Sequence, residues 1–409
     1  MSGTGQILTI NCGSSSLKFA LFELDQNLKK IFEGAVENIG AREGDFFVKD
    51  GEAEYASKVT VADHHAAMAL IREWIKSQPG GTQPDVIVHR IVHGGPDYHQ
   101  PVFLDSRVLA DLEKIIPLDP LHLPVQLSLI KMTSDLFGNT RQAACFDTDF
   151  HHDLPDEARL LALPRRYQTG GLRRYGFHGL SCQSILDELT RIGGERLAGG
   201  RLIVAHLGNG VSLSAILDGK SIDTTMSLTP ASGLPMSTRA GDLDPGLGLY
   251  FSKTEGQDNA AFDHMVNFES GLLGLSETSA DMKRLLELEP DDERARQAVG
   301  LFCYQLKKAI GGLSAALGGL DRLVFTGGMG ENAPKIRVRA CTGLDYLGIK
   351  LETDANESAS PVISTADGRV EVRIIHADEA GQMAKQIGQL MKGGQNDAPW
   401  QQTPQPAAA

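Results

Sequence analysis

The sequence has few features of a secreted, membrane-bound or nucleic-acid-binding protein. No apolar run reaches the roughly 20 residues of a membrane-spanning helix. A strand expected within a few residues of Met1 leaves no room for a signal peptide. Acidic side chains outnumber basic ones, and the formal net charge of -13 argues against nonspecific binding to nucleic acid or to an anionic membrane.

Cysteine is scarce, and its spacing fits no known framework. The 5 cysteines include no C-x-x-C pair, so a disulfide-stabilised fold is not expected. A reduced, cytoplasmic compartment is the simplest expectation. The cysteines are Cys12, Cys145, Cys182, Cys303 and Cys341.

One local pattern occurs twice in the chain. The sequence opens with an apolar run, which is followed by a turn of small polar residues at 11–16 and a second apolar run at 17–24. The same order returns around the turn at 206–210. Apolar runs bounded by turn residues are typical of hairpin strands. Because 409 residues are too many for one compact core, the repeat indicates a duplicated fold of two domains.

The two turns suit the binding of phosphate groups. A hairpin tip without bulky side chains lets backbone N–H groups and small hydroxyls approach phosphate oxygens closely. Two tips facing each other across a cleft could hold a polyphosphate, as in actin, Hsp70 and sugar kinases. We therefore predict an α/β fold of two duplicated, actin-like (ribonuclease H-like) domains with a nucleotide cleft between them.

Charged residues interrupt or follow several buried strands. Arg90 lies inside the apolar run 85–92, where it requires either a structural salt bridge or an anionic ligand. Asp147 follows another apolar run, so it is either a magnesium anchor at a strand end or a turn former. Glu379 follows the last expected strand and is either a ligand or an acid in the first turn of a helix.

The second half adds further candidates. His178 stands at a helix entry, where a capping or core histidine is the alternative to a functional one. The segment 229–246 is dense in turn formers and contains Arg239, and long irregular segments are usually functional. The glycine-rich turn 327–332 follows a buried strand and leads into a helix near Lys335. Such a turn lets a nucleobase or ribose lie against the backbone, and the helix N-terminus favours anionic groups.

The loop-rich stretch 151–175 indicates a domain boundary. We expect an N-terminal actin-like domain of residues 1–150 plus 380–392, and a C-terminal one of residues 151–379. The tail 393–409 is rich in Gln, Pro and Ala, so we expect it to be disordered.

Taken together, the motifs resemble the acetate and propionate kinase family within the actin-like ATPase superfamily, from about residue 8 to residue 385. Their order and spacing carry the resemblance. The motifs are Asn11-Cys12-Gly13-Ser14-Ser15-Ser16-Leu17-Lys18, His89-Arg90-Ile91-Val92-His93-Gly94-Gly95, Arg174-Tyr175-Gly176-Phe177-His178-Gly179, His206-Leu207-Gly208-Asn209-Gly210 and Phe325-Thr326-Gly327-Gly328-Met329-Gly330-Glu331-Asn332.

The resemblance implies reversible transfer of the γ-phosphoryl group of ATP to acetate, with Mg²⁺ or Mn²⁺ as cofactor and a homodimer formed through the second domain. It makes Arg90 and Arg239 a clamp for the carboxylate and the phosphoryl group, and His178 and His206 donors to the phosphoryl oxygens. No general base is needed, because the acceptor carboxylate is already ionised at pH 7.

Further roles are implied in the same way. Asn11, Asp147 and Glu379 would hold or orient the metal. Val92, Leu121, Phe177 and Pro230 would form the pocket for the acyl methyl group, although each could be ordinary core. The residues implied for nucleotide binding are Ser14, Ser16, Lys18, His206, Leu207, Gly208, Asn209, Gly210, Asp281, Met282, Lys283, Gly328, Met329, Gly330, Glu331 and Asn332.

Three positions depart from the family pattern. Leu123 replaces an asparagine, Ser237 replaces a glycine, and Lys283 replaces an arginine that could stack on adenine. The alternatives to acetate transfer are a propionate or butyrate kinase and a non-kinase, actin-like ATP switch. Pocket size decides among the acids, since one methylene changes binding by only about 1 to 3 kcal/mol.

Overall fold

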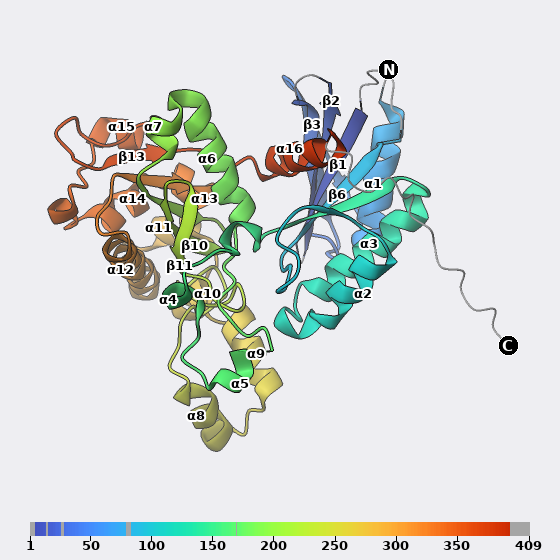
Figure 1. Ribbon diagram of the computed structural model, residues 1–409. Helices are drawn as coiled ribbons and strands as arrows, with labels where there is room; N and C mark the ends of the chain where they lie inside the picture. Colours follow the sequence, from blue (N-terminus) through green and yellow to red (C-terminus); the bar gives the residue numbers. More distant parts are fainter. Residues whose placement is uncertain (1–4, 14, 26–27, 79–82, 169, 393–409) are drawn as a thin grey trace. The chain divides into compact units, whose positions relative to one another are not determined.

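The computed structural model describes residues 5–13, 15–25, 28–78, 83–168 and 170–392. They form two compact units (Figure 1). Unit 1 comprises the described residues of Met1–Asp149 and of Asp378–Ala409, and unit 2 is Phe150–Ala377. The expected disordered tail, 393–409, lies outside the described residues.

Unit 1 is built on a sheet with the strand order β5-β4-β3-β2-β1-β6-β8-β7 in the described residues. Its strands are β1 (Gly5–Cys12), β2 (Ser16–Leu24), β3 (Leu28–Glu37), β4 (Gly44–Asp50), β5 (Ala53–Val59), β6 (Val86–Ile91), β7 (Val102–Phe103) and β8 (Arg141–Phe146). Its helices are α1 (His64–Ser77), α2 (Ser106–Lys114), α3 (Leu123–Phe137) and α16 (Glu379–Lys392), with a 3-10 turn at Ile116–Leu118.

Helices cover both faces of this sheet. Helix α16 packs on β1, β2, β3 and β6, while α1 and α3 lie on the opposite face (Figure 1). Side chains alternate along a strand, so Leu8 and Ile10 join the core under α1, whereas Ile7 turns to the other side. Helix α1 begins after Asp63, because the Asp63 carboxylate accepts a hydrogen bond from the backbone N–H of Ala66.

Unit 2 is built on a second sheet, with the order β11-β10-β9-β12-β13. Its strands are β9 (Arg201–Leu207), β10 (Val211–Leu217), β11 (Lys220–Thr224), β12 (Arg322–Thr326) and β13 (Glu371–Ile374). Its helices are α4 (Asp156–Arg159), α5 (Arg165–Gln168), α6 (Gly179–Gly193), α7 (Glu195–Ala198), α8 (Gly246–Glu255), α9 (Asn259–Phe268), α10 (Gly271–Ser276), α11 (Met282–Leu288), α12 (Glu293–Ala316), α13 (Gly327–Asn332), α14 (Pro334–Cys341) and α15 (Thr353–Glu357). Single 3-10 turns occupy Asp149–His151, at the junction of the units, and Asp345–Leu347.

The two sheets share one topology. In unit 1, β3, β2 and β1 are antiparallel neighbours, and β6 and β8 continue the sheet parallel to β1. In unit 2, β11, β10 and β9 are antiparallel, and β12 and β13 continue parallel to β9. This correspondence confirms the predicted α/β duplication.

The glycine-rich stretch after β12 differs from its expected form. We expected a turn there, but a short helix, α13, begins directly at Gly327. Gly327 has a φ of +77°, and a Cβ atom on it would lie 2.9 Å from the carbonyl carbon and oxygen of Leu207. Only glycine allows this left-handed, tightly packed join between strand and helix.

Among the helices of the described residues, none is both long enough and apolar enough to cross a bilayer.

Candidate functional site

The first cluster lies at the ends of three parallel strands of unit 1. The register pairs Ile10 of β1 with His89 of β6, which places Asn11 beside Arg90, and it pairs Arg90 with Cys145 of β8. Asp147 follows β8 by one residue. Parallel strands therefore bring these polar residues to one edge of the sheet, where open α/β sheets commonly bind ligands.

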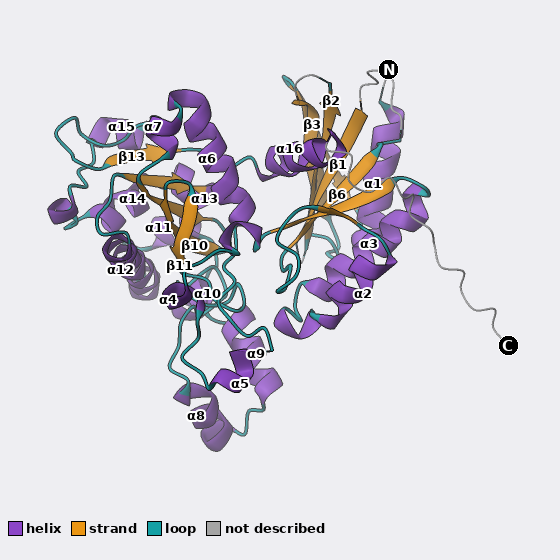
Figure 2. Cartoon of the chain, viewed as in Figure 1, coloured by secondary structure: helices purple, strands orange, loops and turns teal. Residues whose placement is uncertain are grey.

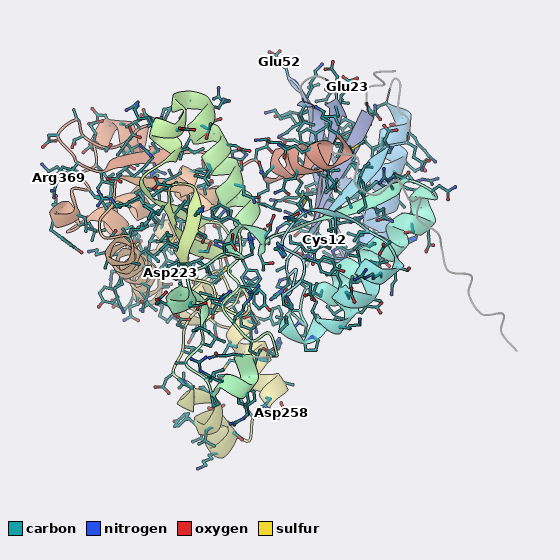
Figure 3. The ribbon with its side chains drawn as sticks, viewed as in Figure 1. Cys12, Glu23, Glu52, Asp223, Asp258 and Arg369 are labelled. Carbon is teal, nitrogen blue, oxygen red and sulfur yellow. The ribbon has the colours of Figure 1, made fainter. Side chains whose placement is uncertain are left out.

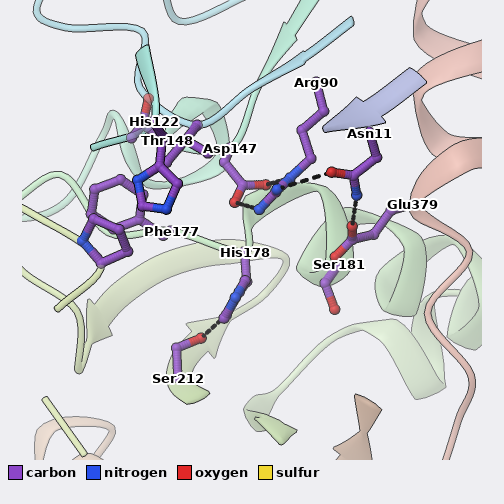
Figure 4. Close-up of polar contacts among 12 residues, drawn as sticks. Asn11, Arg90, His122, Asp147, Thr148, Phe177, His178, Ser181, Ser212 and Glu379 are labelled. Carbon is purple, nitrogen blue, oxygen red and sulfur yellow. Dashed lines mark hydrogen bonds and ion pairs between the residues drawn. The ribbon is translucent and has the colours of Figure 1, made fainter. Parts of the chain in front are cut away.

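These side chains contact one another directly (Figure 4). Arg90 donates from Nη1 to Asn11 Oδ1 at 3.2 Å and from Nε to Asp147 Oδ1 at 3.2 Å, and its Nη2 donates to Asp147 Oδ2. Asn11 Nδ2 donates in turn to Glu379 Oε2 at 3.4 Å, at the first residue of α16. Glu379 is thus both the start of a helix and a member of the cluster.

Arg90 keeps its positive charge although the cluster is largely buried. The side chain of Asp147 is 1% exposed and that of Arg90 is 15% exposed. Burial alone would lower the pKa of Arg90, but the carboxylates of Asp147 and Glu379 more than offset this, and the pKa is raised overall. Arg90 therefore forms the salt bridge that one alternative required, while part of its surface stays accessible to a ligand.

Cys12, labelled in Figure 3, is the last residue of β1 and lies next to this cluster in the chain. Burial raises the pKa of its thiol to about 12, although Arg90 acts in the opposite direction. Burial therefore favours the protonated, unreactive form of this thiol.

The first hairpin turn, between β1 and β2, is closed by a hydrogen bond from Gly13 N–H to the carbonyl of Ser16 at 2.8 Å. Lys18 pairs with Asn11 across the hairpin, so both side chains lie on one face, and Lys18 is exposed. A ring nitrogen of His64, from the first turn of α1, contacts the Gly13 carbonyl at 2.8 Å. Ser14 lies outside the described residues.

The second hairpin turn, between β9 and β10, is the centre of the unit 2 cluster. Gly208 N–H donates to the Gly210 carbonyl at 3.0 Å, so this turn closes over three residues, whereas the first closes over four. A Cβ atom on Gly210 would lie 3.2 Å from His178 Nε2 and 3.6 Å from Arg239 Nη1. A Cβ atom on Gly208 would lie 3.3 Å from His206 Nε2. Two imidazoles and one guanidinium therefore gather at a turn made of glycines.

Serine side chains fix both imidazoles. Ser212 of β10 bonds His178 Nδ1 at 2.8 Å, as Figure 4 shows, and Ser181 of α6 bonds His206 Nδ1 at 2.8 Å. These serines had no place in the sequence prediction. The available signal was weak, because Ser212 is only a polar residue within the apolar run of β10.

Arg239 belongs to a compact irregular segment. Residues 225–245, all of which are described, contain no helix or strand (Figure 2). Arg239 donates from Nη1 to the Pro230 carbonyl at 3.1 Å, and its own carbonyl accepts from Met236 N–H at 2.9 Å. The segment thus holds the guanidinium by contacts close in sequence.

The two nucleotide-binding candidates of unit 2 meet each other. Gly327 packs against Leu207 and Gly208, so α13 begins beside the second hairpin turn. Glu331 accepts from Gly327 N–H at 2.9 Å, and its other oxygen bonds His376 at 3.0 Å. The carboxylate of Glu331 therefore occupies the N-terminus of α13, where a phosphate would meet a negative charge.

The remaining residues predicted to bind the nucleotide differ in how exposed they are. Asp281 caps α11 by accepting from Lys283 N–H at 3.0 Å, and Lys283 is exposed. The side chains of Met282 and Leu207 are buried in the core, so neither can reach a ligand without rearrangement. Gly328, Asn332 and Asn209 are exposed, while Met329 and Ser16 are half-buried and Gly330 is buried.

The residues expected around the acyl methyl group are divided between the units. Val92 and Phe177 are buried, as is Pro230, whereas Leu121 is 37% exposed. Val92 and Leu121 belong to unit 1, and Phe177 and Pro230 belong to unit 2. Phe177 directly precedes His178, which places an apolar side chain next to the unit 2 cluster in the chain.

Arg174 supports the same region of unit 2. It donates from Nη1 to the Thr224 carbonyl at 2.7 Å and from Nε to the Ala158 carbonyl at 3.0 Å. These bonds tie the start of the 174–179 motif to the end of β11. Arg174 belongs to a motif of the sequence but had no predicted role.

Comparison with known proteins places the chain in a family. The model of the acetokinase family matches residues 6–385. The acetate kinase of Rhodopseudomonas palustris is 41% identical over 395 residues, which cover 95% of this chain and 99% of the relative.

Solved structures give the same result. The acetate kinase of Porphyromonas gingivalis has a TM-score of 0.83 at 33% identity, covering 95% of this chain and 100% of that one. A propionate kinase from Francisella tularensis has a TM-score of 0.87 at 32% identity, covering 93% and 98%. The chain belongs to the acetokinase family.

Proposed function

We propose that the chain catalyses the reversible transfer of the γ-phosphoryl group of ATP to acetate, giving acetyl phosphate and ADP. The observation that carries this proposal is the family match over residues 6–385, which includes both clusters described above. The reaction makes the chain a phosphotransferase with a carboxyl group as acceptor.

The chemistry requires positioning and charge stabilisation more than acid–base catalysis. Acetate is ionised at neutral pH, because carboxyl groups have pKa values of about 4, so it can attack the phosphorus without a general base. We assign Arg90 and Arg239 to the negative charges of the carboxylate and of the phosphoryl group in flight. His178 and His206 donate hydrogen bonds to its equatorial oxygens.

The serine contacts support these donor roles. In a neutral imidazole, a hydroxyl that donates to Nδ1 leaves the ring proton on Nε2. Ser212 and Ser181 bond Nδ1 of His178 and of His206 respectively. Both Nε2 atoms, which lie nearest the glycine turn, then carry the protons that the transfer needs.

We assign Mg²⁺, which Mn²⁺ could replace, to Asn11, Asp147 and Glu379. Their donors are carboxylate and amide oxygens, which hard cations prefer. No group of three His, Cys, Asp or Glu side chains suited to a metal occurs in the described part of the chain. An ion here would therefore take most of its ligands from phosphate oxygens and water, as Mg²⁺ commonly does. When bound, it neutralises charge on the phosphates.

For the nucleotide, we assign the phosphates to Ser14, Ser16, Lys18 and the turn 206–210. The nucleoside is assigned to 327–332 and to the exposed residues Asp281 and Lys283. The contact of Gly327 with Leu207 and Gly208 supports a continuous surface for phosphate and ribose within unit 2.

We also propose that the chain is a cytoplasmic homodimer. Unit 2 exposes large apolar side chains on two helices that pack together, α8 and α9. Leu249 is 60% exposed, Tyr250 is 58% exposed and Phe268 is 46% exposed. Large exposed apolar side chains on neighbouring helices are common at interfaces between proteins. Leu249→Glu with Tyr250→Glu should yield a monomer in light scattering coupled to size exclusion, whereas an unchanged mass would contradict this interface.

The acyl acceptor has one specific alternative. The similar structure from Francisella tularensis is described as a propionate kinase, and the two acids differ by a single methylene. Propionate is therefore the second candidate substrate.

A hydroxamate assay for acyl phosphate tests the proposal. Purified protein with magnesium ATP is given acetate, propionate or butyrate in parallel. The highest kcat/KM with acetate is expected, and the highest value with propionate would support the alternative. No acyl phosphate from any acid, with ATP binding intact, would overturn carboxylate kinase activity and favour an ATP-driven switch.

A further inference from the structure

His151 is a buried histidine to which the proposed reaction gives no role. It ends the 3-10 turn Asp149–His151, and its side chain is 1% exposed. Its Nδ1 lies 2.7 Å from Ser221 Oγ of β11, and its Nε2 lies 3.1 Å from the backbone carbonyl oxygen of Phe177. The ring therefore bridges a strand and the residue that precedes His178.

These contacts assign the ring proton. A carbonyl oxygen can only accept a hydrogen bond, so Nε2 of His151 must donate to Phe177. In a neutral ring, Nδ1 then accepts the hydroxyl proton of Ser221, which is itself buried. In this tautomer Nε2 donates to the Phe177 carbonyl and Nδ1 accepts from Ser221, so both ring nitrogens are hydrogen-bonded.

The Phe177 carbonyl is mechanically linked to His178. It belongs to the peptide plane that joins the two residues, so its direction is coupled to the φ angle of His178. That angle is +59°, a left-handed conformation at the entry to α6. A non-glycine residue in this conformation costs about 1 kcal/mol or more, so the surrounding contacts must hold it in place.

Gly176 completes the arrangement on the other side of Phe177. It has a φ of +76°, and a Cβ atom on it would lie 2.7 Å from Cγ and Cδ2 of His151. The backbone therefore packs directly on the imidazole. Gly176 N–H and Tyr175 N–H both donate to the Ser227 carbonyl, which also fixes the backbone just before Phe177.

We propose that His151 is a positioning residue for His178: it clamps the Phe177 carbonyl and the Gly176 backbone, and so holds the strained φ of His178 that aims the imidazole at the glycine turn 208–210. The role of His178 in transfer rests on the proposed function. The clamp itself is a property of the fold.

Kinetics of paired variants test the clamp. His151→Leu should lower kcat about tenfold or more, with KM for ATP and acetate changed by less than about threefold. The reason is that a misplaced His178 imidazole weakens hydrogen bonding mainly in the transition state. His151→Gln keeps an N–H at the reach of Nε2 and should recover most of the loss. Equal kcat for the Leu and Gln variants would overturn the proposal.

A double-mutant cycle separates positioning from general destabilisation. His151→Leu combined with His178→Ala should be no slower than His178→Ala alone, because the clamp acts only through His178. Leu189→Ala, on the buried face of α6 itself, is the matched control and should change the rate by the same factor in both backgrounds. Additive losses for His151 would overturn the proposal.

NMR of protein carrying ¹⁵N-labelled histidine gives a readout that does not need activity. The His151 ring should carry its proton on Nε2, and His151→Leu should shift the ring resonances of His178 while the chain stays folded. A proton on Nδ1, or unchanged His178 resonances, would overturn the clamp. If the native chain makes no acyl phosphate, the proposed function fails, and these spectra still decide the role of His151.

Discussion

The imidazole rings of His178 and His206 stack with their centroids 4.1 Å apart and their planes inclined by 23°. One ring is held by a serine from β10 and the other by a serine from α6. Two protonated rings at this separation would repel each other by about 4 kcal/mol at an effective dielectric constant of 20. The stack therefore favours at least one neutral ring, whose proton position depends on its serine.

The first prediction concerns Ser212. Ser212→Ala should lower kcat about tenfold, because a neutral His178 that loses its hydroxyl partner can carry its proton on Nδ1 and cease to donate from Nε2. Ser212→Thr keeps the hydroxyl and is the control. Steady-state rates of acyl phosphate formation provide the measurement, and equal rates for the two variants would contradict the prediction.

A second prediction concerns Arg239. Arg239→Ala should lower kcat about a thousandfold, as expected when an arginine that neutralises a phosphoryl transition state is removed, with a much smaller change in ATP affinity. Arg201→Ala is the matched control in the same unit, since Arg201 forms a partly exposed ion pair with Asp321 and such pairs contribute little. Unchanged turnover of the Arg239 variant would remove this residue from the reaction.

The third prediction concerns the metal. Glu379→Gln keeps the shape of the side chain but removes its charge, so the Mg²⁺ concentration for half-maximal rate should rise about tenfold. Asp378→Asn is the control, because Asp378 directly precedes α16, accepts a hydrogen bond from Gly381 N–H in its first turn and has no proposed role in metal binding. The rate is titrated with Mg²⁺ at fixed ATP. If both variants need the same Mg²⁺ as the native chain, Glu379 does not serve the metal.

A fourth prediction concerns stability at acidic pH. His89 is buried with a ring nitrogen 2.7 Å from Gln142 Oε1, and burial lowers its pKa from 6.5 to about 4 despite this bond. Between those values the unfolded chain binds a proton that the folded chain does not, so stability falls as pH decreases from about 6.5 to about 4. The loss attributable to His89 should reach about 3 kcal/mol.

Urea unfolding at a series of pH values measures this loss. His89→Gln removes the titrating group and should flatten the stability profile in that range, whatever its effect on stability at neutral pH. A profile with an unchanged slope would show that other groups cause the acid sensitivity.

Local patterns in the sequence pointed to Arg90, Asp147 and Glu379 of the first cluster, whereas Asn11 was implied only by the family resemblance. Apolar runs and turn residues predicted the strands. Arg90 was singled out as a charged residue inside an apolar run, and Asp147 as a carboxylate at the end of a strand. These signals are local because strand periodicity, turn chemistry and helix capping depend on residues within a few positions of each other.

The residues that hold the two histidines of the second cluster could not be predicted from local sequence patterns. Ser181 and Ser212 are ordinary serines in sequence, and they matter only because the fold brings α6 and β10 to the two histidines. The same holds for His151, whose partners lie on distant segments. The helical form of 327–332 depends on the packing of Gly327 against another strand, which periodicity does not reveal.

The position of α16 in the chain has a consequence for biosynthesis. This helix buries Met383, Ala384 and Ile387 against the sheet of unit 1, yet the ribosome makes it only after the whole of unit 2. Until then, apolar residues on that face of the sheet, such as Ile7 and Val88, have no covering helix. A nascent chain halted before Glu379 would therefore expose this apolar face of unit 1 to chaperones. Glu379 would join the polar cluster only after α16 has been made and has packed on unit 1.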